Sequence, residues 1–372
     1  MARRVRGKAL LMKTYTCTCG QLLFFENSTC VSCKREVGFL PDLICMSSLD
    51  PANEGFFSAT ADEAKGQVYK KCQNYTQAGV CNWMIPADNA EAFCVSCRLD
   101  TVIPDQSVPQ NVVLWSLTEA AKRRLVYSSL RLKLPLANRV DEPERGLGFR
   151  FLADVTKPDG SVERVITAHD HGLITLNLAE ADDAAREKMR MGMKEPYRTL
   201  LGHFRHETGH YYWDRLVDNS QFLEPFRALF GDERQSYEDN MKTYYANGAP
   251  ENWQDNFISA YATMHPWEDW AESWAHYLHV QDTLEVAADF GLVGKRIKID
   301  PKGNAEGKQA SLKAKPFDQV LETWAELTVA LNSINRSMGL RDLYPFILSQ
   351  PVVDKLHFIS EVIAGSDTAE VK

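Results

Sequence analysis

The pattern of apolar and polar positions changes along the chain, and it predicts strands before helices. The stretches GLGFRFLADV (146–155) and SVERVITAHDHGLITLNL (161–178) alternate with a period of two around a turn at 158–160, as strands do. The stretch 114–135 predicts a helix, preceded by a linker at 101–111. Its apolar-to-small stripe is Leu114, Leu117, Ala121, Leu125 and Ser128.

The stretch GLITLNL (172–178) predicts either a sheet edge that pairs with an extended peptide or an ordinary core strand.

From residue 179 onward the spacing of apolar residues is helical almost to the end of the chain. A basic, glycine-bearing stretch at 292–315 interrupts it and is expected to be a mobile loop. The predicted helices are 179–193, 195–216, 233–248, 252–264, 265–291, 317–339 and 351–365. Strands followed by helices indicate an α+β fold with a small sheet and many helices.

The nine cysteines all lie between Cys17 and Cys97. Paired CxxC spacings in a reducing compartment are typical of metal ligands rather than of disulfides. We predict two structural zinc sites of four cysteines each, with the sorting of ligands between them left open: Cys17, Cys19, Cys30 and Cys33, and Cys72, Cys81, Cys94 and Cys97. Zinc would supply folding energy that this core-poor segment lacks. Cys45 remains as a small buried apolar residue.

The sequence HETGH, residues 206–210, places two histidines four residues apart. On a helix, which Pro196 can open, both imidazoles project from one face and can bind one Zn²⁺, while Glu207 reaches a water on the metal. Gly209 costs about 1 kcal/mol against alanine in a helix, which a close approach by another backbone would explain. His203, one turn earlier, either lines the cleft or is a paired polar core residue.

A catalytic zinc site needs a third protein ligand and an open fourth position. A helix begins at Pro266, and its apolar stripe is Trp267, Trp270, Trp274 and Leu278. Glu268 lies on a second face and is the predicted ligand, with Asp269 as the competing ligand on the polar flank. Glu272, one turn on, would accept the second ring N–H of a zinc histidine such as His206.

These motifs resemble the glutamate-zincin (gluzincin) metallopeptidases, whose third zinc ligand comes from such a downstream helix. In lethal-factor-like members of that group, a tyrosine seven residues before this ligand hydrogen-bonds the developing oxyanion, and Tyr261 stands at that offset. More closely, about Met12 to Leu343 resembles a bacterial family of zinc-binding metallopeptidases with an N-terminal zinc ribbon. The stretches that carry this resemblance are CGQLLFFEN, CNWMIP, CVSCRLD, GLITLNLAEAD, EPYRTLLGHFRHETGHYYWDRLV and ISAYATMHPWEDWAESWAHYLH.

The resemblance implies a zinc-ribbon domain at 12–105 and a zincin-like metallopeptidase domain at 111–365. In the expected reaction, Glu207 activates a zinc-bound water that attacks a peptide carbonyl, and Tyr261 with the zinc stabilises the oxyanion. One catalytic and two structural zinc ions are expected, with a peptide or protein as substrate. Amidase or deformylase chemistry would use the same ligands.

The main alternative function is a binding or regulatory module in which the ribbon recognises a protein or nucleic acid and the zincin-like domain is not proteolytic. A net charge of −8 and the mildly basic ribbon do not favour nucleic acid, which leaves a protein partner as the open case. No apolar segment is long enough for a signal peptide or a membrane span, so we expect a cytoplasmic protein.

Overall fold

The computed structural model describes residues 15–53, 55–193, 199–293 and 317–366. Among these residues, 15–277 and 346–366 form one compact unit, and 278–293 with 317–345 form a second. The predicted loop at 292–315 lies almost entirely outside the described residues. None of the helices in the described ranges is long and apolar enough to cross a membrane.

The N-terminal segment is built on a five-stranded antiparallel sheet in the order β3-β4-β5-β6-β7. Its strands are β3 (Glu36–Leu40), β4 (Cys45–Pro51), β5 (Phe56–Ala59), β6 (Val68–Lys71) and β7 (Met84–Pro86), and β1 (Tyr15–Thr16) pairs separately with β2 (Leu22–Leu23). Phe39 and Trp83 are fully buried, with ring centroids 4.7 Å apart. The expectation of a core-poor segment is therefore wrong, because the sheet closes over an aromatic core.

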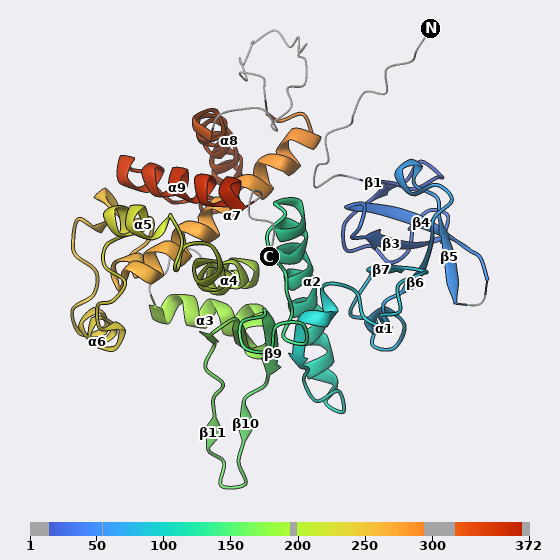
Figure 1. Cartoon of the computed structure of the whole chain (residues 1–372), viewed down its shortest axis with the longest axis horizontal. Coiled ribbons are helices and arrows are strands. Elements are labelled where there is room, and N and C mark those ends of the chain that lie inside the picture. The colour runs from blue at the N-terminus through green and yellow to red at the C-terminus, as the bar shows by residue number, and fades with distance from the viewer. Residues whose placement is uncertain (1–14, 54, 194–198, 294–316, 367–372) are drawn as a thin grey trace, which may run out of the picture. The chain divides into compact units, whose positions relative to one another are not determined.

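A second, four-stranded sheet has the order β12-β13-β9-β8. Its strands are β8 (Asp100–Val102), β9 (Gly148–Leu152), β12 (Ala168–Asp170) and β13 (Leu173–Asn177). GLITLNL forms β13, which pairs with β12 on one side and β9 on the other, so it is a core strand and the edge is β12. The turn at 158–160 joins β10 (Val155–Thr156) to β11 (Val162–Glu163) in a projecting hairpin (Figure 1).

Helices make up most of the rest of the described chain, which confirms the α+β class. They are α2 (Pro109–Arg131), α3 (Asp183–Met193), α4 (Leu200–Leu216), α5 (Leu223–Phe230), α6 (Tyr237–Asn247), α7 (Pro266–Asp289), α8 (Phe317–Ser337) and α9 (Gln350–Ser366), besides the short α1 (Gln73–Thr76). The helix predicted at 252–264 is wrong, since only two 3₁₀ turns form there, η4 (Trp253–Asp255) and η5 (Tyr261–Thr263).

The predicted linker at 101–111 is correct only for residues 103–108, which form a loop without strand or helix. Its first residues belong to β8, which pairs with β9, and its last residues begin α2 at Pro109. The predicted stripe of α2 is only partly correct: Ala121, Leu125 and Ser128 are buried, but Leu117 is 50% exposed. The charged Glu119 and Lys122 are buried as well. Lys122 forms ion pairs with Asp100 and Glu119, so paired charges occupy a face that the apolar pattern could not identify.

Candidate metal centre

Helix α4 presents the two histidines of HETGH. The helix begins at Leu200, where the Thr199 hydroxyl accepts a hydrogen bond from the Gly202 amide at 3.0 Å and so satisfies one of the free N–H groups of the first turn. Pro196, the predicted start, lies outside the described residues. His206 and His210 then follow one turn apart, and both are buried.

Helix α7 brings the third side chain because it packs very closely on α4 at Gly209. A Cβ at Gly209 would lie only 2.9 Å from the Ala271 Cα, and the Trp270 indole donates a 2.8 Å hydrogen bond to the Gly209 carbonyl. The glycine in HETGH therefore permits the close approach of a backbone, as its sequence predicts. This contact sets Glu268, one turn before Ala271, opposite the histidines.

Three donor atoms converge between the two helices. His206 Nε2 lies 2.9 Å from Glu268 Oε2, and His210 Nε2 lies 3.4 Å from Glu268 Oε1. Zinc ligands placed tetrahedrally at 2.0–2.2 Å from the ion lie about 3.4 Å from one another. Among the described residues no well-aligned donor satisfies the buried Glu268 Oε2. Two imidazole nitrogens and one carboxylate group at these separations fit a zinc ion.

Asp269, the competing ligand, points elsewhere. It is fully buried rather than on a polar flank, and its Oδ2 pairs with Lys355 Nζ of α9 at 2.6 Å. Its carboxylate therefore anchors α9 to α7, which leaves Glu268 as the acidic residue that faces the histidines.

The site holds its carboxylates in the ionised form. Burial alone would raise the pKa of Glu268, but His210 and His206 hold that pKa well below its usual range. Burial likewise opposes ionisation of Glu207, yet His203 lowers its pKa. A zinc ligand and a general base both act as carboxylates, so both groups are in the state that their predicted roles require.

Glu272 lies where the sequence predicted support for a histidine ligand. His206 Nδ1 is 2.6 Å from Glu272 Oε1, one helical turn beyond Glu268. A carboxylate on Nδ1 keeps the proton there and leaves Nε2 free to bind a metal. Glu268 thus lies at the metal centre, and Glu272 lies behind His206.

Tyr261 lies beside the histidines in η5, with its ring 6.1 Å from that of His206. Burial, reinforced by the charge of Glu268, raises the pKa of Tyr261, so its hydroxyl remains a proton donor. The hydroxyl of Tyr237, at the start of α6, interacts with that of Tyr261 and donates a 2.8 Å hydrogen bond to Glu268 Oε1. Sequence reasoning missed Tyr237, because no local spacing links it to a ligand 31 residues later.

Tyr237→Phe is expected to weaken zinc binding at this centre by about 10-fold, because it removes the donor that fixes Glu268 Oε1. The zinc affinity can be measured by competition with a chromophoric chelator. Tyr245→Phe is the matched control, since Tyr245 lies on the same helix with 64% of its surface exposed. Equal affinities in the two variants would show that Tyr237 does not hold the ligand.

Gly209→Ala is expected to separate α4 from α7 despite the better helix propensity of alanine. The new Cβ would press on the Ala271 backbone at 2.9 Å and on Trp274 Cβ at 3.3 Å. The overpacking should cost about 1–3 kcal/mol against a propensity gain of about 1 kcal/mol. Urea unfolding and zinc analysis should show lower stability and loss of one zinc, with the cysteine-bound zinc retained. Full zinc content at unchanged stability would contradict this packing.

His203, predicted as a cleft residue or a paired core residue, lies against Glu207. Its Nε2 is 3.0 Å from Glu207 Oε1, and its Nδ1 is 2.5 Å from Glu180 Oε2. Burial would lower the pKa of His203, but the two carboxylates outweigh it and raise the pKa to about 9.

The eight predicted cysteine ligands gather into two clusters with the predicted membership. The sulfur pairs Cys17–Cys33 and Cys19–Cys30 are each 3.6 Å apart, and Cys81–Cys94 is 3.8 Å apart. Four sulfurs at about 2.3 Å from a central zinc lie about 3.8 Å from one another, whereas a disulfide requires about 2.05 Å. Both clusters fit zinc, including the one that contains the CxC pair. Cys45 lies apart from them, buried on β4.

Backbone amides lower the pKa of Cys17 and Cys30 in the first cluster, whereas the Arg35 amide is outweighed by burial and the neighbouring cysteines, which raise the pKa of Cys33. Partial burial raises the pKa of Cys17, but the Cys19 amide and the Ser48 hydroxyl lower it to about 6. A thiol with so low a pKa is largely thiolate at neutral pH, and the thiolate is the form that binds zinc.

A third cysteine-containing group is filled by the protein itself. Cys97, Asp100 and Glu119 lie close enough to share an ion, but Lys122 Nζ occupies the space between the two carboxylates. The ammonium group supplies the positive charge there, so this cluster connects the second cysteine site to α2 and does not fit a metal.

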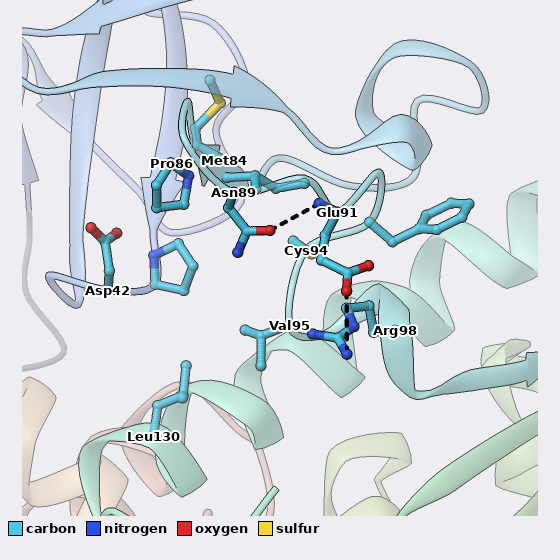
Figure 2. A pocket seen from close by; sticks show the side chains of 12 residues that line it. Asp42, Met84, Pro86, Asn89, Glu91, Cys94, Val95, Arg98 and Leu130 are labelled. Atoms are coloured by element: carbon cyan, nitrogen blue, oxygen red, sulfur yellow. Dashed lines mark hydrogen bonds and ion pairs between the residues drawn. The ribbon is translucent and has the colours of Figure 1, made fainter. Parts of the chain in front are cut away.

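The ribbon segment also carries an apolar hollow of about 260 Å³, separate from the metal-binding side chains of α4 and α7. Figure 2 shows Arg98 and Glu91 paired at its rim, with Asn89 beside them. The apolar side chains that line it include Pro41, Met84, Ile85, Pro86, Phe93, Val95 and Leu130.

Comparison with known proteins agrees with this arrangement. Residues 111–362 match the family model described as "Putative zinc-binding metallo-peptidase", and residues 14–108 match that of a zinc-ribbon domain. The uncharacterized proteins Rv2568c of Mycobacterium tuberculosis and Mb2598c of Mycobacterium bovis are each 41% identical over 354 residues, which cover 95% of this chain and 95% of each relative. No solved structure matches the chain. The predicted resemblance to a zinc-ribbon metallopeptidase is confirmed.

Proposed function

Because the chain belongs to this family of zinc-binding metallopeptidases, we propose that it hydrolyses peptide bonds with Glu207 as the general base. The observation that carries the proposal is the convergence of His206, His210 and Glu268, with the unsatisfied Glu268 Oε2 facing the imidazoles. The buried Glu207 carboxylate adjoins this centre without being one of its three donors.

A zinc ion held by His206, His210 and Glu268 would act as a Lewis acid that lowers the pKa of a water molecule and polarises the substrate carbonyl. Glu207 would accept a proton from the attacking water and deliver it to the nitrogen of the leaving amine. The protonated Tyr261 hydroxyl would donate a hydrogen bond to the oxyanion that develops on the carbonyl oxygen. During the reaction Glu272 would hold the His206 ring in place, and Tyr237 would hold the Glu268 carboxylate in place.

The edge strand β12 supports an extended peptide as the substrate. It packs against α4, and its His169 ring is 5.8 Å from the ring of His210. Among the strands that the structure describes, β12 pairs only with β13, so its other edge can pair with the main chain of a peptide. The sequence pattern had suggested β13 for this role.

The proposal is tested with the zinc-loaded full chain and a peptide library, with products identified by mass spectrometry. We expect cleavage at internal peptide bonds that stops on chelation and returns on addition of zinc. A chain with zinc in the two cysteine clusters and at the histidine–glutamate centre that cut no peptide would count against the proposal and favour a binding role for the ribbon.

A further inference from the structure

Glu207 stands at the end of a chain of hydrogen-bonded side chains that the metal centre does not require. The Thr167 hydroxyl lies 2.5 Å from Glu180 Oε1, and Glu180 Oε2 lies 2.5 Å from His203 Nδ1. His203 Nε2 then lies 3.0 Å from Glu207 Oε1. The imidazole thus bridges two carboxylates, one of which is the proposed base.

Glu180 is held at a fixed place by its own surroundings. It lies in η3 (Leu178–Ala181), which is capped by the Asn177 side chain accepting from the Ala179 amide at 2.9 Å. Arg186 of α3 donates a 2.8 Å hydrogen bond to the Glu180 carbonyl. With only 4% of its surface exposed, this carboxylate is costly to bury, and its side-chain partners include Thr167 and His203.

The bridge restricts the orientation of the base. An imidazole that donates from both ring nitrogens fixes one oxygen of each neighbouring carboxylate. Oε1 of Glu207 is the oxygen that faces His203, so the Oε2 lone pairs are the ones left for water. A general base that can rotate freely must lose that freedom before each proton transfer, and a fixed one need not.

We propose that His203 and Glu180 are positioning residues for Glu207, which together fix its carboxylate so that Oε2 faces the attacking water. This inference rests on the proposed function, because it assigns the orientation of its base. A purely structural bridge would only tie η3 to α4.

The first test is Glu180→Gln in the zinc-loaded full chain, assayed on a fluorogenic peptide that the wild type cleaves. We expect kcat to fall about 10- to 100-fold, with KM and zinc content unchanged. Glu142→Gln is the matched control, because it removes the carboxylate paired with Arg215 on the same helix without touching Glu207. It should keep the wild-type kcat. Equal kcat values for the two variants would overturn the proposal.

A double variant distinguishes a residue that positions Glu207 from one that only stabilises the fold. Adding Glu180→Gln to Glu207→Gln should cause no further loss of the residual rate, because the orienting residue then has no base to orient. A structural bridge would instead lower the rates of both backgrounds by the same factor, and that result would overturn the proposal.

A second readout needs no substrate. The proton on His203 Nδ1, 2.5 Å from a carboxylate oxygen, should resonate far downfield of the amide region in the ¹H NMR spectrum. It should shift upfield in Glu180→Gln, because an amide oxygen is a weaker acceptor than a carboxylate, and stay in place in Glu272→Gln, which weakens the hydrogen bond of His206 instead. A spectrum without this resonance would refute the bridge itself, whereas normal cleavage by Glu207→Gln would refute the proposed function and leave the resonance in place.

Discussion

A Glu207→Gln variant is expected to lose about 10²- to 10⁴-fold in kcat for peptide hydrolysis while keeping the zinc content of the wild type. The substitution preserves the shape of a side chain that is not among the three metal donors, but an amide cannot take a proton from water. His203 can still donate to the Gln oxygen, so the helix should remain folded. Progress curves with a cleavable peptide and metal analysis of the same preparation measure both quantities.

Two controls make this result interpretable. Glu224→Gln changes an exposed glutamate whose side chain is 80% accessible on α5, and it should leave kcat unchanged. Glu268→Gln should instead lose zinc from the centre, because it removes a charged ligand. If Glu207→Gln cleaved at the wild-type rate, the mechanism would be wrong even with every zinc in place.

Cys94→Ser is expected to release one zinc and to destabilise the chain by more than about 4 kcal/mol, since loss of a metal ligand is among the few changes with so large an effect. All four thiols of this cluster are buried, so water cannot easily replace the missing sulfur. Cys97 of the same cluster also adjoins Glu119 of α2, and Lys122 of that helix pairs with both Glu119 and Asp100 of β8. The damage should therefore reach beyond the ribbon.

Cys45→Ser is the matched control for this variant, because Cys45 is equally buried but belongs to neither cluster. It should keep the wild-type zinc content and lose far less stability. Zinc analysis and guanidinium unfolding of the two variants measure the difference. Retention of zinc by Cys94→Ser, or its loss from Cys45→Ser, would contradict the assignment of ligands.

Local sequence was sufficient where chemistry depends on spacing within one element. The four-residue interval of HETGH puts two imidazoles on one helix face, and the interval from Glu268 to Glu272 does the same for two carboxylates. The CxxC pairs indicated zinc in the same way. Gly209 also predicted the close packing of another backbone, because glycine inside a helix has a cost that such packing can offset.

Local sequence patterns failed where the burial of a residue depends on the neighbouring helix or strand. The apolar stripe predicted for α2 is partly exposed, because ion-paired Glu119 and Lys122 occupy a buried face. Helical spacing at 252–264 gave only short 3₁₀ turns, and the pattern of GLITLNL could not distinguish an edge strand from the core strand that it forms beside β12. In each case the neighbouring element, not the segment itself, decided the outcome.

The sequence by itself thus predicted the candidate zinc ligands and determined the helices that carry them and the α+β class. Only the tertiary structure decided that Asp269 pairs with Lys355, that Tyr237 holds Glu268, and that Glu180 reaches Glu207 through His203. The physical reason is the separation along the sequence between the residues that interact. Helical periodicity relates residues three or four positions apart, such as His203 and Glu207, whereas the other contacts join residues that are 23 to 86 positions apart and meet only when separate elements pack.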